Sequence, residues 1–131
     1  MIEIQIDNDR RLVLATATGV LSEEDILTYM EEFWSLQGVE GYNELLDLRE
    51  VKPAVSFSSK RLRDLSQLAA SMDVQTTATK FAIVVQDDFL FEFARTYEIY
   101  RNSNPQSTKH FCTFRTMQDA LAWIGENKLR N

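Results

Sequence analysis

The sequence predicts an α/β protein: a single domain with a mixed, mostly parallel sheet of about five strands, an N-terminal β-hairpin and about four helices. Three observations lead to this fold class. The chain has 131 residues, a length that suits one compact core. Two strand-like segments come first, and segments with helix and strand patterns then alternate. The later strand-like segments are short continuous apolar runs, which are typical of parallel strands covered on both faces.

The N-terminal hairpin is predicted by the alternation of apolar and polar residues. Ile2, Ile4 and Ile6 alternate with polar residues, and a second β-rich run covers residues 12–18. Residues 7–9 between the two runs are Asp-Asn-Asp, which are turn residues. Two strand-like runs joined by such a short turn are typical of antiparallel pairing.

The first helix is predicted to begin at Glu23. Ser22 is placed to cap this helix, and the carboxylate of Asp25 is placed to accept from the amide of Ser22. Gly38 and Gly41 are expected to end the helix. Its apolar face carries Ile26, Leu27, Met30, Phe33 and Trp34, at the spacing that a helix places on one side.

The rest of the chain alternates strand and helix patterns. The expected elements are a strand at 45–48, a helix over 62–72, a strand from Lys80, a helix over 87–102, a strand over 109–115 and a helix over 117–124. Strands that alternate with helices form parallel pairs through right-handed crossovers. The order of the strands stays open, and we expect no linker or repeat within the single domain of residues 1–131.

The composition argues against two classes of partner. The formal net charge is −6 and the sequence pI is about 4.8, so most of the surface repels nucleic acid and anionic lipid headgroups. No run approaches the roughly 18 apolar residues of a transmembrane helix, and the first residues lack the pattern of a secretory signal. Cys112 is the single cysteine, so we expect no internal disulfide and a cytoplasmic location.

Three short segments carry a resemblance to a known family. They are Leu46-Asp47-Leu48-Arg49, the strand end Val84-Val85-Gln86-Asp87, and Ala94-Arg95 inside an aromatic-rich helix. Together with the order of elements, they resemble the SpoIIAA-like branch of the STAS superfamily over nearly the whole chain. The resemblance implies a bacterial domain without a catalytic signature, and members of this branch are also compared with lipid-binding SEC14-type domains.

The loop before the second helix is the place of a known switch in this superfamily. In the anti-sigma factor antagonists an Asp-Ser-Ser-Gly motif lies there, and a partner kinase phosphorylates one serine. The corresponding stretch here is Phe57-Ser58-Ser59-Lys60, in which both serines match and the flanking residues differ. Ser58 and Ser59 are therefore candidate phosphoacceptors, with Ser56 as a third hydroxyl nearby. The alternative is that Ser58 or Ser59 simply caps the helix.

Basic residues gather around the same loop in an otherwise acidic protein. Five of the fourteen lysines and arginines are Arg49, Lys52, Lys60, Arg61 and Arg63. Ligands of open α/β sheets bind beyond the carboxyl ends of strands, so this cluster and Asp47 form a candidate site for an anionic ligand or an acidic partner surface. The alternative is a solvated helix flank, balanced by Glu50 and Asp64.

The expected helix over 87–102 is rich in aromatic residues. One stripe holds Phe89, Phe93, Tyr97 and Tyr100, and Phe91 lies off it. A homodimer interface or a small apolar ligand would cover the extra aromatic surface. Its candidate binding residues are Phe91, Tyr97 and, at a partly exposed rim, Arg95. The alternative is that the stripe belongs to the ordinary core.

No motif in the sequence indicates catalysis, a metal or another cofactor. His110 and Cys112 share a face of one expected strand, but a structural zinc site takes four ligands, and an ordinary strand role is the alternative that we favour. The four glycines stand apart, and neither a phosphate-binding glycine loop nor a Gly-x-Ser-x-Gly motif occurs. We expect no enzyme; a cryptic hydrolase would depend on Asp47, Ser58 or His110.

The leading hypothesis is a non-catalytic regulatory or protein-interaction module. It would bind another chain, or a second copy of itself as a homodimer, through the 49–63 loop or the aromatic helix. The alternative is a carrier of a small apolar or amphipathic, lipid-like ligand. A carrier requires a cavity near Phe89, Phe91, Phe93 and Tyr97.

Overall fold

The computed structural model describes residues 1–33, 38–52, 58–73 and 77–126. In these residues the elements are β1 (Ile2–Asp7), β2 (Leu12–Val20), α1 (Glu23–Phe33), β3 (Asn43–Lys52), α2 (Ser59–Ser71), β4 (Thr79–Val84), α3 (Asp88–Ser103), β5 (Lys109–Phe114) and α4 (Met117–Gly125). The predicted fold class is confirmed, with the N-terminal hairpin, five strands and four helices within the described residues.

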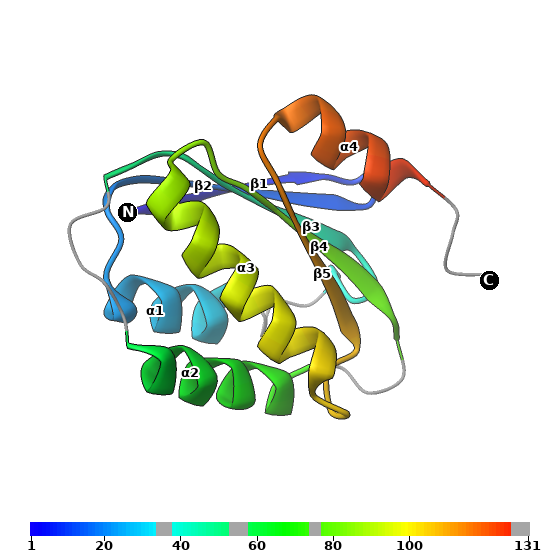
Figure 1. Ribbon diagram of the computed structural model, residues 1–131. Helices are drawn as coiled ribbons and strands as arrows, with labels where there is room; N and C mark the ends of the chain where they lie inside the picture. The colour runs from blue at the N-terminus through cyan, green and yellow to red at the C-terminus, as the bar shows by residue number, and fades with distance from the viewer. Residues whose placement is uncertain (34–37, 53–57, 74–76, 127–131) are drawn as a thin grey trace.

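The sheet follows the order of the chain, β1-β2-β3-β4-β5. Only β1 and β2 pair antiparallel, and the later neighbours are parallel. Crossovers that all step in one direction and are all right-handed place their helices on one face of the sheet. Accordingly, α1, α2 and α3 lie on one face, and α4 covers the other (Figure 1).

The parallel strands are covered on both faces, as their apolar runs predict. All six residues of β4 are buried. Phe81 and Ile83 belong to the core under α1–α3, whereas Ala82 and Val84 belong to the core under α4. Successive residues of a strand point to opposite faces, so a strand between two helix layers is mostly apolar on both sides. The polar Thr79 and Lys80 lie at the start of β4.

The start of α1 is as predicted, but its buried face differs in part. The amide of Ser22 donates to Asp25 Oδ2 and the amide of Asp25 donates to Ser22 Oγ, each at 3.1 Å, and α1 begins at Glu23. Among its described side chains, the buried ones are Met30, which was expected, and Tyr29, which was not. The side chain predicted at Phe33 and the position predicted for Trp34 lie outside the described part of the chain.

A buried ion pair joins the ends of two helices. Arg101 near the end of α3 donates from Nη2 to both carboxylate oxygens of Asp73, just after α2, at 2.8 and 2.6 Å. Both side chains are 0% exposed. Asp73 also accepts from the amide of Thr108 at 3.0 Å, and the guanidinium lies 4.4 Å from the ring centre of Phe111. The pair therefore connects α2, α3 and β5.

A second buried pair links α1 to the sheet. Lys109 Nζ lies 2.6 Å from Glu44 Oε2, and the hydroxyl of Tyr29 donates to Glu44 Oε1 at 2.9 Å. Burial lowers the pKa of Lys109, although the neighbouring Glu44 carboxylate opposes this shift. The two buried pairs lie at the amino ends of the parallel strands, because Glu44 and Lys109 are among the first residues of β3 and β5.

Breaking the buried ion pair should destabilise the protein strongly. We expect Arg101→Met to lower the free energy of unfolding by about 3–5 kcal/mol, because Asp73 would remain as a buried carboxylate without its charged partner. The matched control is Arg10→Met, which removes a solvent-exposed pair with Asp7 and should cost less than about 1 kcal/mol. Urea unfolding followed by circular dichroism measures the free energy of unfolding of both variants. Equal losses in the two variants would contradict the role of the buried pair in stability.

Candidate functional site

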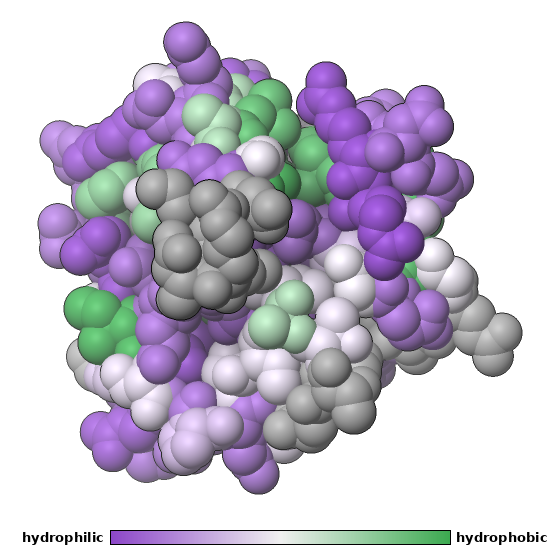
Figure 2. Space-filling model, turned by 90° about the vertical axis from the view of Figure 1, so that its right-hand side faces the viewer, coloured by the Kyte–Doolittle hydropathy of each residue, from purple (hydrophilic) through white to green (hydrophobic). Residues whose placement is uncertain are grey.

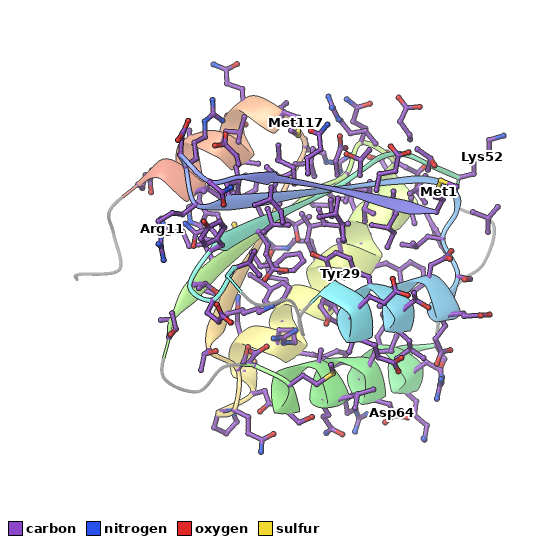
Figure 3. All side chains as sticks on the ribbon, turned by 180° about the vertical axis from the view of Figure 1, so that it is seen from behind. Met1, Arg11, Tyr29, Lys52, Asp64 and Met117 are labelled. Carbon is purple, nitrogen blue, oxygen red and sulfur yellow. The ribbon has the colours of Figure 1, made fainter. Side chains whose placement is uncertain are left out.

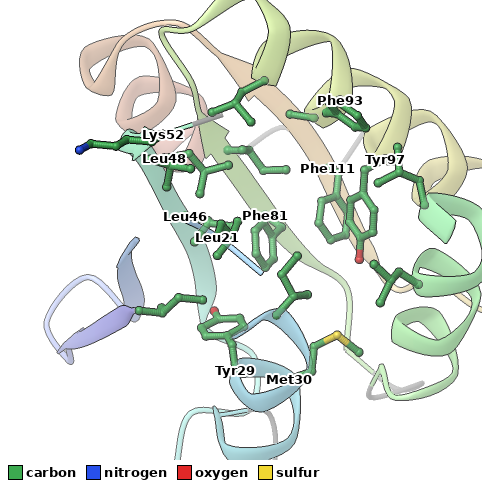
Figure 4. A pocket seen from close by; sticks show the side chains of 18 residues that line it. Leu21, Tyr29, Met30, Leu46, Leu48, Lys52, Phe81, Phe93, Tyr97 and Phe111 are labelled. Atoms are coloured by element: carbon green, nitrogen blue, oxygen red, sulfur yellow. The ribbon is translucent and has the colours of Figure 1, made fainter. Parts of the chain in front are cut away.

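An apolar cavity of about 140 Å³ lies between the sheet and the helices α1, α2 and α3. Side chains from all of these elements surround it (Figure 4). Its lining consists of Ile2, Leu21, Ile26, Tyr29, Met30, Leu46, Leu48, Val51, Lys52, Leu62, Leu65, Phe81, Ile83, Leu90, Phe93, Ala94, Tyr97 and Phe111.

The cavity floor is formed by strands and its walls by helices. Phe81 of β4 and Phe111 of β5 stack on the floor, with ring centres 4.6 Å apart. Tyr29 extends from α1 toward the sheet (Figure 3), and Phe93 and Tyr97 reach in from α3 (Figure 4). Large side chains on a rigid floor and on separate helices leave a space that none of them fills.

A β-bulge in β3 enlarges the apolar part of the floor. The register pairs Thr16 with Asp47 but Thr18 with Glu50, so β3 has one residue more than β2 in this interval. Without the bulge, Leu48 and Val51 would point to opposite faces of the sheet. With it, both line the cavity.

The interior of the cavity carries no free charge. The hydroxyl of Tyr29 is bonded to Glu44, and the hydroxyl of Tyr97 accepts from Arg101 Nη1 at 3.2 Å. Burial raises the pKa of Tyr97, although Arg101 opposes the shift, so this phenol is neutral at pH 7. The amino group of Lys52 is directed away from the cavity (Figure 4).

The two ends of the cavity differ in character. One end is lined by Leu21, Val51 and Lys52, which lie at or just after the carboxyl ends of β2 and β3. Ligands of open α/β sheets bind at this end of the strands. The face at the opposite end of the strands is mostly hydrophilic, and its described hydrophobic residues form only small patches (Figure 2).

Of the candidate binding residues on the aromatic helix, only Tyr97 lines the cavity. The ring of Phe91 packs against the core and has the guanidinium of Arg115 4.0 Å from its centre. Arg95 is half exposed, as expected, and lies 3.5 Å from Glu98 in an ion pair. Phe93 lines the cavity, whereas Phe89 is 51% exposed. The aromatic stripe is therefore divided between cavity wall and surface.

Asp47 and Arg49 form a pair on the other face of the sheet. Asp47 lies two residues after Leu45, which packs in the core under α4, so the two share that face. Arg49 donates to both carboxylate oxygens of Asp47 at 3.0 and 2.9 Å. Burial alone would raise the pKa of Asp47, but the hydrogen bonds and charge of Arg49 outweigh it and lower the pKa.

The residues at the start of α2 have local partners. Ser58 is the N-cap, and its Oγ accepts from the amide of Arg61 at 3.2 Å. Lys60 Nζ lies 3.2 Å from Asp64 Oδ2, and Arg61 forms an ion pair with Glu23. Asp64 lies on the side of α2 away from the sheet (Figure 3). Lys60 and Arg61 belong to α2, on the face of the sheet opposite to α4, whereas Asp47 and Arg49 lie on the α4 side, so the predicted cluster is divided between two faces.

Some of the predicted switch residues lie outside the described part of the chain. These are Ser56, Phe57 and the side chain of Ser59, the first residue of α2. Ser58 is described, and the alternative interpretation, that it caps the helix, matches its hydrogen bond to the amide of Arg61.

His110 and Cys112 lie on the face of β5 that α4 covers. The ring of His110 is centred 5.9 Å from that of Trp123 on α4. Burial raises the pKa of the Cys112 thiol, and Glu98 adds to this shift. In the described part of the chain, no three His, Cys, Asp or Glu side chains are grouped in a way that would hold a metal ion.

Sequence reasoning missed most of the cavity lining and the buried pairs that surround it. Glu44, Asp73, Arg101 and Lys109 appear in the sequence as ordinary charged residues. An apolar cavity has no sequence motif, because it depends on how completely neighbouring side chains fill the space between layers. The one available signal was the surplus of aromatic residues between Phe89 and Tyr100.

Comparison with solved structures identifies the fold. The chain is similar to the crystal structure of an uncharacterised protein from the DUF3478 family with a SpoIIAA-like fold, from Shewanella loihica PV-4. The TM-score is 0.58 and the sequence identity 23%, over 95% of this chain and 92% of that chain. No protein-family model and no curated protein matches the sequence. The SpoIIAA-like fold predicted from the sequence is thus confirmed.

The described helices were also compared with the requirements for crossing a membrane. None of them combines sufficient length with sufficient apolar character to span a bilayer.

The N-cap of α2 gives a direct test at Ser58. Ser58→Ala should lower the free energy of unfolding by about 1 kcal/mol, because the amide of Arg61 loses its acceptor. Ser58→Asp is the matched control and should stay within a few tenths of a kcal/mol of the wild type, since aspartate caps helices equally well. Thermal or urea unfolding measures the difference, and equal stability of the alanine and aspartate variants would show that the cap contributes nothing.

The Asp47–Arg49 pair predicts a dependence of stability on pH. The folded pKa of Asp47 is lowered, so its contribution is complete above the unfolded pKa of about 3.9 and is lost as the pH falls through the folded pKa. Asp47→Asn should therefore destabilise the protein at pH 7, and the difference from wild type should shrink below about pH 4. Asp64→Asn, in an exposed pair, should change stability little at any pH. If Asp47→Asn lowered the free energy of unfolding by the same amount at pH 7 and below pH 4, the contribution of the pair would be refuted.

Proposed function

We propose that this SpoIIAA-like domain is a non-catalytic binding module that holds a small apolar molecule, or the apolar part of an amphipathic one, in the cavity. The observation that carries the proposal is a space of about 140 Å³ with an almost wholly apolar lining, next to the carboxyl ends of the parallel strands. The cavity includes Phe93 and Tyr97, where the carrier hypothesis requires a cavity. Pockets of mainly hydrophobic and aromatic lining are typical of small-molecule sites.

The size of the cavity limits the ligand. An engineered apolar cavity of about 150 Å³ in another protein stays dry and binds benzene or xenon. A cavity of 140 Å³ therefore suits one aromatic ring or a short hydrocarbon segment. A longer ligand fits if its remaining part leaves the cavity beside Lys52, whose charge favours a carboxylate or phosphate there.

The chemistry of the lining supports an uncharged occupant. Both hydroxyl groups in the lining, those of Tyr29 and Tyr97, are already hydrogen-bonded to protein side chains. An ion inside would lose its hydration without gaining a charged partner, at a large cost in free energy. Binding is therefore driven by burial of apolar surface.

The positions of the hydrolase candidates favour a module without catalysis. Asp47 aligns with Phe114 across β4, so His110 lies four residues away along β5 and two strands across. Ser58 caps a helix on the face opposite to α4. General acid–base catalysis needs such groups within about 3 Å of each other or of one substrate.

The hypothesis of a partner-binding basic loop receives less support from the geometry. Arg49, Lys60 and Arg61 each have a carboxylate partner within the chain. An acidic partner would have to displace these carboxylates, which reduces the gain from each new ion pair. Binding through residues 49–63 stays a prediction, and the cavity is the better-supported site.

The proposal predicts that benzene and similar uncharged rings bind to the protein. A ligand that binds only the folded state stabilises it, by about 1.4 kcal/mol at ten times the dissociation constant. We therefore expect benzene to raise the melting temperature and to shift NMR signals of residues around Phe81, Tyr97 and Phe111. Benzoate is the charged comparison, and it should bind more weakly, because its carboxylate would lose hydration inside the apolar cavity.

Two substitutions of alanine by leucine provide the matched test. Ala94→Leu places a larger side chain in the cavity and should abolish benzene binding. Ala122→Leu makes the same change at an exposed position of α4 and should leave binding unchanged. The proposal fails if the wild type does not respond to benzene, or if both variants bind it as the wild type does.

A further inference from the structure

The two edges of the sheet differ in whether side chains of the protein already bind their outward backbone groups. At the β5 edge, Asn102 of α3 accepts from the amide of Phe111 and donates to its carbonyl oxygen, both at 2.8 Å. Glu98, one turn earlier, accepts from the amide of Thr113 at 2.7 Å. These side chains occupy backbone groups that a further strand would use, so this edge is closed to strand addition.

The other edge is formed by β1, which ends the strand order in the described part of the chain. The amide of Thr18 donates to the carbonyl oxygen of Met1 at 2.9 Å. Backbone groups of a strand alternate in direction, so residues 1, 3, 5 and 7 turn theirs toward β2. Ile2, Ile4 and Ile6 therefore direct their amides and carbonyls outward, where another strand can bind them.

The side chains of the same three isoleucines lie on the helix-covered face. Ile2 lines the cavity, and Ile4 and Ile6 follow on that face at intervals of two. Ile4 is 38% exposed and Ile6 is 41% exposed. A strand added beside β1 would cover both side chains and would also satisfy the outward backbone groups.

We propose that two copies of this chain associate through their β1 edges, antiparallel, around a two-fold axis at Ile4. The edge is self-complementary in this arrangement, as a two-fold interface requires. Ile2 of each copy lies opposite Ile6 of the other, and Ile4 lies opposite its own equivalent. The two sheets become one continuous sheet, and each of these residue pairs exchanges both backbone hydrogen bonds.

Charge selects this register over its neighbours. With Ile4 on the axis, Glu3 lies opposite Gln5 of the second copy. A shift of the axis to Glu3 places two glutamates directly opposite each other, and a shift to Gln5 places Glu3 opposite Asp7. Like charges directly opposite across a sheet are destabilising. The register centred on Ile4 is also the only one of the three in which the outward backbone groups of Ile2, Ile4 and Ile6 are all paired with isoleucines of the second copy.

The test is sedimentation equilibrium of the purified protein from about 10 μM to about 1 mM, because an interface of one strand pair is small and the dimer is expected to be weak. The wild type should be a monomer–dimer mixture. Gln5→Lys should lower the dissociation constant about threefold to tenfold, because each introduced ammonium lies opposite a glutamate, and Gln5→Glu should raise it by a similar factor. Both substitutions are at an exposed position.

Ile4→Lys tests the axis itself. It places two ammonium groups next to each other and should remove the dimer over the whole concentration range. Phe89→Lys is the matched control, since it also replaces an apolar side chain that is 51% exposed, and it should dimerise like the wild type. Circular dichroism checks that each variant is folded. A monomeric wild type, or a dimer that responds alike to both Gln5 substitutions, would overturn the proposal.

Discussion

The packing of α2 and α3 against the sheet depends on the ion pair between Arg101 and Asp73, which lies wholly out of contact with solvent. Neither charge can be hydrated there, so each keeps the other in place. The pair holds the end of α2 against the end of α3 and the start of β5. Because Arg101 also donates to Tyr97 and lies over Phe111, it positions two side chains of the cavity lining as well.

The position of the cavity is explained by the distribution of buried polar contacts along the strands. The Arg101–Asp73 pair and the contact of Tyr29 with Glu44 both lie near the amino ends of the parallel strands. At the carboxyl ends the lining has only apolar side chains and Lys52. Hydrogen bonds and ion pairs demand definite geometry, whereas apolar contacts tolerate a gap at moderate cost. The helices are thus joined by buried polar contacts at the amino ends of the strands, whereas at the carboxyl ends Arg61 of α2 and Glu23 of α1 form a partly exposed pair, and a binding space is left beneath it.

Much of the fold was predictable because it depends on local or periodic patterns. The reciprocal hydrogen bonds of Ser22 and Asp25 involve residues three apart, and the burial of β4 follows from a continuous apolar run. The candidate site was less predictable. Asp47 and Arg49 lie close in sequence to the start of α2, yet the alternation of strand residues points them toward α4. The cavity instead joins Tyr29, Phe81 and Tyr97, which no short pattern connects.

The sequence by itself determined the hairpin, the start of α1 and the parallel strands, since capping and hydrophobic periodicity act over a few residues. The SpoIIAA-like fold was indicated by the resemblance of three short segments to that family. Only the tertiary structure decided which charges are buried as pairs, which aromatic rings face the cavity, and which sheet edge stays open. These properties depend on the distances between elements far apart in the chain. Arg101 and Asp73 are 28 residues apart, and nothing in either neighbourhood indicates that they meet.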